Sequence, residues 1–340
     1  GFKVQPKTSY GDQRTAQLSP IFQYTFEYTV DNTELTANTV TNGGTVTQAD
    51  AMAVVTTSTT TASTAKLRSK QHAKYRSGQG GLLRFDALFT APIAATEQLV
   101  GLAGEVGSSQ SFKNGYMIGY IGTIFGLHRF VNDAIVTVAQ ASWDDPLDGT
   151  GASGMTLDHT KLNEYAIEFQ SPAGEFSLLI EDDSTGAFII VHTVLYANTS
   201  TVPQVYNPNF CHTIYVDNKG TTSNLIIKTA AFAFFNEGLT ELIEWHQPQF
   251  SPGAQEKLTV TTPVAIFTIR NKATYASQEN FIDIILERFG GQIEAASANN
   301  LGLLSLVRNG TLGGTPSWSD ISTTNSVVEV DSSATTVTGG

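Results

Sequence analysis

The chain has 340 residues, 41% of them hydrophobic, and its formal charge is −12 at pH 7. That apolar content suffices for packed cores, so the composition excludes a disordered chain. Residues 91–340 carry 10 basic and 25 acidic side chains, which argues against non-specific nucleic-acid binding, because such binding needs Lys and Arg to displace counterions.

Only 15% of the residues are charged, and Thr, Ser, Asn and Gly take their place. Thr is β-branched and packs well on a pleated sheet, while Asn and Gly form turns, so the composition favours an all-β fold. The single cysteine, Cys211, excludes an intrachain disulfide and is expected to be a buried thiol, in keeping with assembly in a reducing cytoplasm. No apolar run approaches 18 residues, so we expect no membrane span.

Residues 1–66 are predicted to form an extended N-terminal arm that serves as an oligomerisation segment. Residues 21–30 alternate polar and apolar side chains and predict a strand. The threonine-rich tract at 56–64 is compatible with a linker or with a strand. We expect residues 45–65 to contact neighbouring subunits, so that their deletion would leave soluble monomers.

Residues 67–246 are predicted to form a jelly-roll sandwich, because short alternating stretches are broken by turn residues every 8–12 positions. In the stretch 82–89, Leu83, Phe85, Ala87 and Phe89 share one face. A hairpin is expected at Gly122-Thr123. The other predicted strands are 98–103, 164–169, 175–181, 188–194, 211–216, 225–229 and 231–235.

A short helix is the best interpretation of residues 239–245, and 247–262 are predicted to be a linker because they are polar and contain Pro248, Pro252 and Gly253. Residues 263–340 are predicted to form a C-terminal β-sandwich. Its expected strands are 265–270, 282–287, 303–308 and 326–330. The chain ends on the turn signal Thr338-Gly339-Gly340, so we expect the native domain to continue.

Several glycine-rich stretches, in this order along the chain, resemble a lectin-like (concanavalin-like) sandwich module of phage and large-virus structural proteins. They are 74–85, 98–101, 148–158, 186–197 and 207–208, and 308–318 resembles the C-terminal part of such proteins. The resemblance implies a fibre, collar or capsid-surface subunit located at the virion surface. It implies no catalytic residues. The segment 108–113 departs from the pattern, which puts any ligand site in that loop in doubt.

The loop at 143–158 holds the candidate ligand contacts, Trp143, Asp144, Asp145 and Asp148. An exposed Trp can stack on a sugar, although a core edge or a subunit contact is the more common role of such a residue. The carboxylates suit calcium, but Pro146 interrupts the EF-hand pattern and a solvated acidic turn is the default. Residues 149–154 match G-x-G-x-x-G without the flanking strand and helix that a dinucleotide site requires. We therefore predict no cofactor and no metal.

No catalytic site is predicted, and the chain is interpreted as a non-enzyme. Glu164 and Glu168 could share a strand face, as could Glu175 and Glu181, but neither pair forms a recognisable acidic trio. The six histidines form no zinc-binding pair. One basic cluster, formed by Lys66, Arg68, Lys70, Lys74, Arg76 and Arg84, is interpreted as a solvated strand face or a contact with an acidic neighbour rather than as a nucleic-acid site.

The leading functional prediction is a virion structural subunit that assembles as a homo-oligomer, a trimer or higher, with other virion proteins. Low charge and abundant Thr leave strand edges with few protective charges, which favours self-association. The alternatives are a lectin module that binds a host glycan and a polysaccharide hydrolase.

Overall fold

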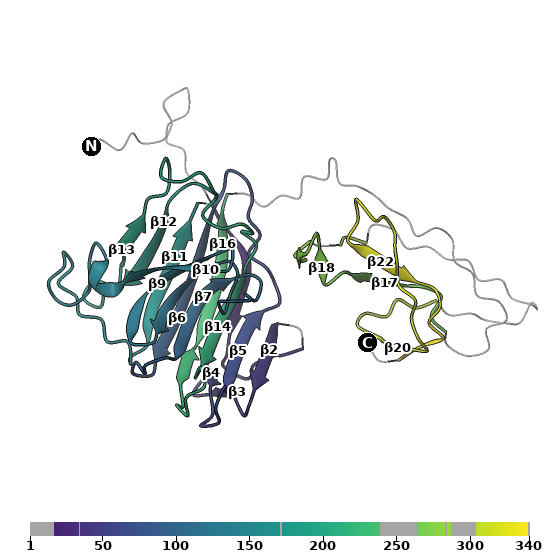
Figure 1. Cartoon of the computed structure of the whole chain (residues 1–340), viewed down its shortest axis with the longest axis horizontal. Coiled ribbons are helices and arrows are strands. Elements are labelled where there is room, and N and C mark those ends of the chain that lie inside the picture. The colour runs from purple at the N-terminus through teal and green to yellow at the C-terminus, as the bar shows by residue number, and fades with distance from the viewer. Residues whose placement is uncertain are drawn as a thin grey trace, which may run out of the picture. The chain divides into compact units, whose positions relative to one another are not determined.

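The computed structural model describes residues 17–33, 35–170, 172–238, 264–282, 284–286 and 304–338. The chain divides into two compact units, residues 1–241 and 242–340 (Figure 1). Strands dominate the described residues of both units, and one 3-10 helix, η1, spans Gln140–Ser142. The all-β prediction is therefore confirmed, while the predicted helix at 239–245 lies outside the described residues.

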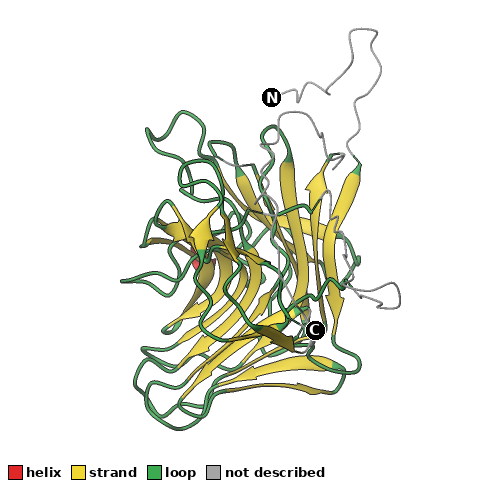
Figure 2. Cartoon of the chain, turned by 90° about the vertical axis from the view of Figure 1, so that its right-hand side faces the viewer, coloured by secondary structure: helices red, strands yellow, loops and turns green. Residues whose placement is uncertain are grey.

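The first unit is a sandwich of two antiparallel sheets, seen from the side in Figure 2. The nine-stranded sheet contains β1 (Leu18–Thr25), β3 (Thr45–Ala49), β4 (Met52–Thr56), β6 (Gly80–Phe89), β11 (Asn163–Phe169), β12 (Phe176–Glu181), β13 (Phe188–Val194), β15 (Ile226–Thr229) and β16 (Ala231–Glu237). The seven-stranded sheet contains β2 (Thr36–Thr41), β5 (Thr64–Ser69), β7 (Glu97–Ala103), β8 (Gly115–Ile121), β9 (Ile124–Val131), β10 (Ala134–Ala139) and β14 (Cys211–Asp217). Strands distant in sequence, such as β7 and β14, lie side by side, as in a jelly roll.

Strand β6 carries the clearest signature of the buried core. Leu83, Phe85, Ala87 and Phe89 are each at most 1% exposed and face the seven-stranded sheet, as the alternation predicted. One edge of β6 pairs with β11. Along the other edge, the first half of β6 pairs with β16 and its last two residues pair with β15. The core between the sheets is therefore continuous across this change of partner.

The predicted hairpin is confirmed, because Ile121 lies opposite Ile124 and the turn contains Gly122 with a φ of +61°. A left-handed φ is accessible to glycine at no steric cost, which explains why this turn forms here. Cys211 is buried, as expected.

The N-terminal arm predicted at residues 1–66 is wrong for the residues that the structure describes. Residues 18–69 supply five strands to the two sheets, and Ala53, Val55, Ala65 and Leu67 are fully buried. Deleting residues 45–65 would therefore remove core strands rather than release an intersubunit arm. The physical reason is that each alternating stretch here has an apolar face, and the sandwich core covers it.

The threonine-rich tract is neither a free linker nor a single strand. It leaves β4 at Thr56, turns, and enters β5 at Thr64. The buried Asn218 amide holds this turn, because Asn218 Nδ2 donates to Ser58 O (3.2 Å) and Thr60 O (2.8 Å).

The described residues of the second unit form small sheets rather than the predicted sandwich. A three-stranded sheet contains β17 (Thr268–Asn271), β22 (Val328–Asp331) and β21 (Ser319–Asp320). Two further pairs are β18 (Thr274–Tyr275) with β19 (Gln278–Glu279), and β20 (Thr311–Gly313) with β23 (Thr336–Thr338). Strands were predicted at 282–287 and 303–308, but the described residues of these segments are irregular. Their apolar runs are too poorly covered to form ladders, since Leu306 is 69% exposed.

Among the described residues, no helix has the length and apolar character needed to cross a membrane.

Candidate functional site

The loop that follows η1 brings the four predicted ligand residues together but uses most of them internally. Trp143 is only 5% exposed, contacts Phe125 edge-on and donates its indole N–H to Val138 O (3.2 Å). Asp145 is 7% exposed and accepts N–H bonds from Leu147 (3.2 Å) and Ser153 (2.7 Å). The expectation that the Trp143 ring is available to a sugar is therefore corrected, because its faces are packed in the core.

Asp144 and Asp148 are exposed, and both bind nearby backbone groups. Asp144 Oδ2 accepts the N–H of Thr193 (3.0 Å) and lies 3.1 Å from His192 Nδ1, so it covers the edge of β13. Asp148 Oδ1 accepts the N–H (2.9 Å) and hydroxyl (2.6 Å) of Thr150. These bonds lower the pKa of Asp148. Contact of Asp144 and Asp148 with a ligand stays a prediction. Within the described ranges, no group of three or more His, Cys, Asp or Glu side chains could hold a metal ion.

A second, more exposed set of functional side chains lies on the outer face of the nine-stranded sheet. We call it the carboxylate face; its members are Arg84, Glu164, Glu168, Glu181, Phe188, Phe235 and Glu237. They share this face because each alternates with core residues on its own strand. Arg84 is exposed, and its guanidinium carbon lies 5.6 Å from the Phe188 ring centroid and 5.8 Å from that of Phe235. Both aromatic rings therefore lie near the Arg84 guanidinium, on a face that also carries four glutamate side chains.

Glu164 and Glu181 lie opposite each other on neighbouring strands. Tyr165 pairs with Ile180, which places Glu164 against Glu181 at the end of the ladder, where opposed Cβ atoms are about 5 Å apart. Partial desolvation raises the pKa of Glu164 although its side chain reaches solvent, and the carboxylates of Asp86 and Glu181 raise it further. This part of the face thus favours a protonated carboxyl or an approaching cation.

Glu168 and Glu237 form a carboxyl pair across Gly80. A Cβ at Gly80 would lie 2.1 Å from Glu237 Oε2, so only glycine lets this side chain cross the strand. Burial raises the pKa of Glu237 to about 7, and the hydrogen bond with Glu168 and its like charge add to the effect. Glu237 is therefore protonated below about pH 7, because a second negative charge beside the Glu168 carboxylate forms only at a cost.

The distance between two of these carboxylates decides whether they can act together in catalysis. Glycoside hydrolysis uses carboxyl groups about 5–9.5 Å apart. The hydrogen-bonded Glu168 and Glu237 are too close for a sugar ring to enter between them. Glu164 and Glu168, which do share a face as predicted, are separated by four residues of strand, about 13 Å. Glu164 falls near the required spacing with two carboxylates, Glu181 on β12 and Asp86 on β6, and of these two Asp86 is buried.

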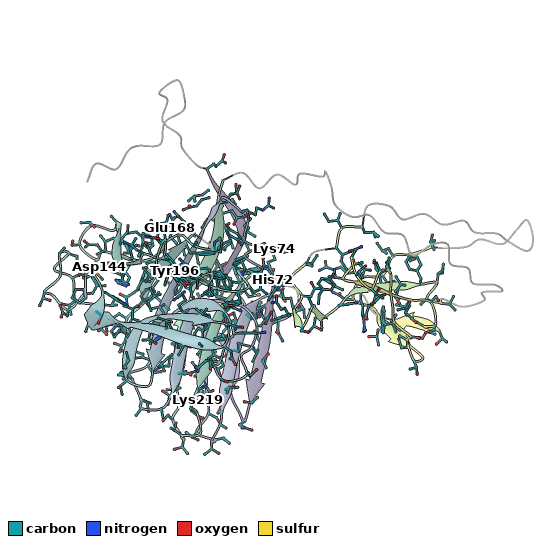
Figure 3. The ribbon with its side chains drawn as sticks, turned by 45° about the horizontal axis from the view of Figure 1, so that its top comes forward. His72, Lys74, Asp144, Glu168, Tyr196 and Lys219 are labelled. Atoms are coloured by element: carbon teal, nitrogen blue, oxygen red, sulfur yellow. The ribbon has the colours of Figure 1, made fainter. Side chains whose placement is uncertain are left out.

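A third polar cluster lies at the other end of the sandwich from Glu168 and Asp144 (Figure 3). Lys219 Nζ lies 3.3 Å from both Glu97 Oε1 and Asp217 Oδ2 and donates to Ser111 Oγ (3.1 Å). Ser111 belongs to the divergent loop at 108–113, whose Phe112 packs in a small apolar cluster on the outer face of the seven-stranded sheet. This cluster therefore fastens the loop.

The predicted basic cluster does not assemble into one patch. Lys66 and Arg68 lie on β5 of the seven-stranded sheet, whereas Arg84 lies on β6 of the nine-stranded sheet. The pairing of Glu237 with Glu168 and the aromatic rings beside Arg84 were not predicted from the sequence. Alternation on each strand could have placed these residues on an outer face, but only strand order brings the strands together.

No family model matches the sequence, and no curated protein matches it. Solved structures match about two thirds of the chain. Peanut lectin with a bound nonapeptide is 11% identical over 65% of this chain and 99% of its own, with a TM-score of 0.42. Lectin II from Ulex europaeus is 13% identical over 65% of this chain and 100% of its own, with a TM-score of 0.42. The catalytic domain of an endo-1,3-β-glucanase (laminarinase) from Thermotoga petrophila is 10% identical over 65% of this chain and 98% of its own, with a TM-score of 0.44.

The matched proteins include both lectins and a glucanase, so the likeness does not separate sugar binding from hydrolysis. At these identities and TM-scores it carries no argument about what this chain binds. The comparisons also give no support to the virion role predicted from the sequence.

Proposed function

We propose that the chain is a carbohydrate-binding module that holds a glycan on the carboxylate face. The observation that carries the proposal is the placement of the Phe188 and Phe235 rings near the Arg84 guanidinium, with one exposed and three half-buried carboxylates on the same face. A sugar presents apolar C–H faces and hydroxyl groups. The first stack on aromatic rings, and the second donate to carboxylates.

The sheet itself suits such a role because it holds these side chains in place. Beneath the face, Leu83, Phe85, Tyr165 and Ile167 are at most 1% exposed, so the strands that carry the polar side chains are anchored by the core. A rigid sheet loses little conformational entropy when a ligand binds, which favours preorganised recognition.

Phe188→Ala is expected to weaken glycan binding at least about tenfold, because it removes one stacking ring and loosens Arg84. The measurement is a glycan array followed by titration calorimetry with the best ligand. Tyr28→Ala is the matched control, since Tyr28 is an aromatic residue 93% exposed that lies after β1 and outside the face. Binding that survives Phe188→Ala unchanged, or that is absent for every glycan, would refute the proposal.

A second candidate function, polysaccharide hydrolysis, is favoured by the opposed Glu164 and Glu181. The raised pKa of Glu164 fits a general acid, and Glu181 on the next strand has the spacing for the second carboxyl. Hydrolysis is tested by incubating the chain with the same glycans and measuring the reducing ends that are released. Turnover that disappears in Glu181→Gln while glycan binding remains would establish an enzyme; an intact glycan after long incubation would leave a binding module.

We further propose that this module acts at the surface of a virus particle. The resemblance of residues 74–85 and the later glycine-rich stretches to virion proteins supports the proposal. Immunogold electron microscopy with antibody against residues 67–238 is expected to label regular projecting sites on particles. Unlabelled particles beside free antigen in the medium would instead indicate a secreted protein.

A further inference from the structure

A lysine, a glutamate and an asparagine meet beside the connection between β7 and β8. Lys113 Nζ lies 3.1 Å from Glu105 Oε2, and Asn207 Nδ2 donates to Glu105 Oε1 (3.3 Å). Glu105 and Asn207 are 7% and 8% exposed, whereas the Lys113 side chain is 32% exposed. One buried carboxylate therefore holds an amine with one of its oxygens and a carboxamide with the other.

Two parts of the chain place these three side chains together. The N–H of Lys113 donates to Glu105 O (2.8 Å), so the two residues lie opposite each other where the loop after β7 begins and ends. Asn207 belongs to the segment that leads into β14, and Asn114 Oδ1 accepts the N–H of the preceding Tyr206 (2.9 Å). The flexible stem of Lys113 lets its amine move from the carboxylate to the carboxamide beside it.

The oxygen of the Asn207 carboxamide has hydrogen-bond donors of its own. Asn207 Oδ1 accepts the backbone N–H of Asn209 (3.3 Å) and a side-chain N–H of the same residue (3.0 Å). These donors on one side and the Glu105 carboxylate on the other fix the orientation of the carboxamide. Two N–H donors on a carbonyl oxygen stabilise the negative charge that develops there when a nucleophile adds to the carbon.

Pro208 removes the reaction that most often consumes an asparagine side chain. In that reaction the backbone nitrogen of the following residue attacks the carboxamide, and it must carry an N–H to do so. Proline has no backbone N–H, so the cyclisation is closed to Asn207. The carboxamide therefore remains available to the Lys113 amine.

We propose that Lys113 and Asn207 form an intramolecular amide bond, and that Glu105 is the catalytic residue that moves the protons. Glu105 takes a proton from the Lys113 ammonium, and the neutral amine adds to Asn207 Cγ. Glu105 then delivers this proton to Nδ2 and takes a second proton from Nζ. The Cγ–Nδ2 bond breaks, ammonia leaves and accepts the second proton, and Glu105 is again a carboxylate. Nothing is oxidised or reduced.

The surroundings of Asn207 favour the bond once it has formed. Val205 and Phe210, close to Asn207 in sequence, are at most 1% exposed, so water has little access to the amide. The bond joins the loop after β7 to the segment before β14, at the end of the ladder that pairs these strands. It gives a chain with a single cysteine a covalent link that no intrachain disulfide can supply. The proposal does not depend on glycan binding.

Intact-mass spectrometry of the full chain tests for the bond. Wild type is expected to weigh about 17 Da less than its sequence, the mass of one ammonia. Trypsin does not cleave after an acylated lysine, so peptide 85–129 should stay uncut at Lys113 and remain joined to peptide 162–219. A folded wild type of full mass would overturn the proposal.

Substitutions separate this bond from other losses of ammonia. Lys113→Arg keeps a cation beside Glu105 but has no amine to attack Cγ, and Glu105→Gln removes the base, so both should have full mass. Asn207→Asp should lose about 18 Da, because water leaves in place of ammonia. Lys219→Arg is the matched control: Lys219 also lies 3.3 Å from carboxylate oxygens, and its replacement should keep the wild-type deficit. A deficit of about 17 Da that persists in Lys113→Arg would refute the bond.

Discussion

Replacing His212 with phenylalanine is expected to make the sandwich markedly more resistant to acid. His212 is fully buried, its ring stacks on Phe232 at 4.0 Å between centroids, and neither ring nitrogen has a hydrogen-bond partner among the described residues. Burial lowers the pKa of His212 to about 3. Burial likewise lowers the pKa of His128, which bonds Gly119 O and Thr137 Oγ1 (3.0 Å each), to about 4.

The direction of the pH effect follows from these lowered values. Below pH 6.5 the unfolded chain binds protons at these histidines and the folded chain does not, so stability falls as the pH drops from 6.5 toward 3–4. At pH 5, 1.5 pH units below the unfolded pKa, each histidine costs about 2 kcal/mol.

Thermal unfolding at pH 7.5, 6 and 5 measures the effect. His212→Phe should recover about 2 kcal/mol at pH 5 and gain further at all pH values, because it removes an unpartnered buried polar ring. His192→Gln is the control, since His192 lies at the sheet edge beside Asp144, and it should keep the acid sensitivity of wild type. An acid slope in His212→Phe equal to that of wild type would contradict the assignment.

Asp86→Ala is expected to lower the free energy of unfolding by about 3 kcal/mol. The carboxylate is 4% exposed and accepts the N–H groups of Ala230 (2.5 Å) and Ala231 (2.8 Å) at the point where β6 changes partner from β16 to β15. Alanine would leave both donors buried without an acceptor. Desolvation raises the pKa of Asp86, so the measurement belongs at pH 7.5 or above, where the charged form is best populated.

Urea unfolding of Asp86→Ala, Asp86→Asn and Glu164→Ala gives the comparison. Asparagine offers one acceptor oxygen in place of two and should fall between alanine and wild type. Glu164 lies opposite Asp86 on β11 and is exposed, so its removal should change stability by less than about 0.5 kcal/mol. Equal losses for Glu164→Ala and Asp86→Ala would show that charge rather than backbone support governs the effect.

The structural roles of Asp86 and His212 could be predicted from the sequence only in part. Asp86 lies two residues from Arg84, on the polar side of the alternating stretch 82–89. Its burial depends on Ala230 and Ala231, which are more than 140 residues away in the chain. His212 also lies in a readable strand, but the rings around it come from β6 and β16.

The same limit applies to the candidate site. Loop chemistry predicted a ligand site at residues 143–148 because aromatic and acidic residues adjoin there in sequence. In the fold, Trp143 and Asp145 face inward, and the exposed acidic and aromatic surface arises instead from five strands that are separate in sequence. Adjacency along the chain was therefore a poor guide to adjacency on the face.

The sequence by itself determined the all-β class, the positions of most strands of the sandwich and the buried face of β6, because alternation with period two is a local property of each strand. It could not determine strand order, since pairing depends on contacts between distant segments. Only the tertiary structure showed that residues 18–69 belong to the sandwich and that Glu237 reaches Glu168 across Gly80.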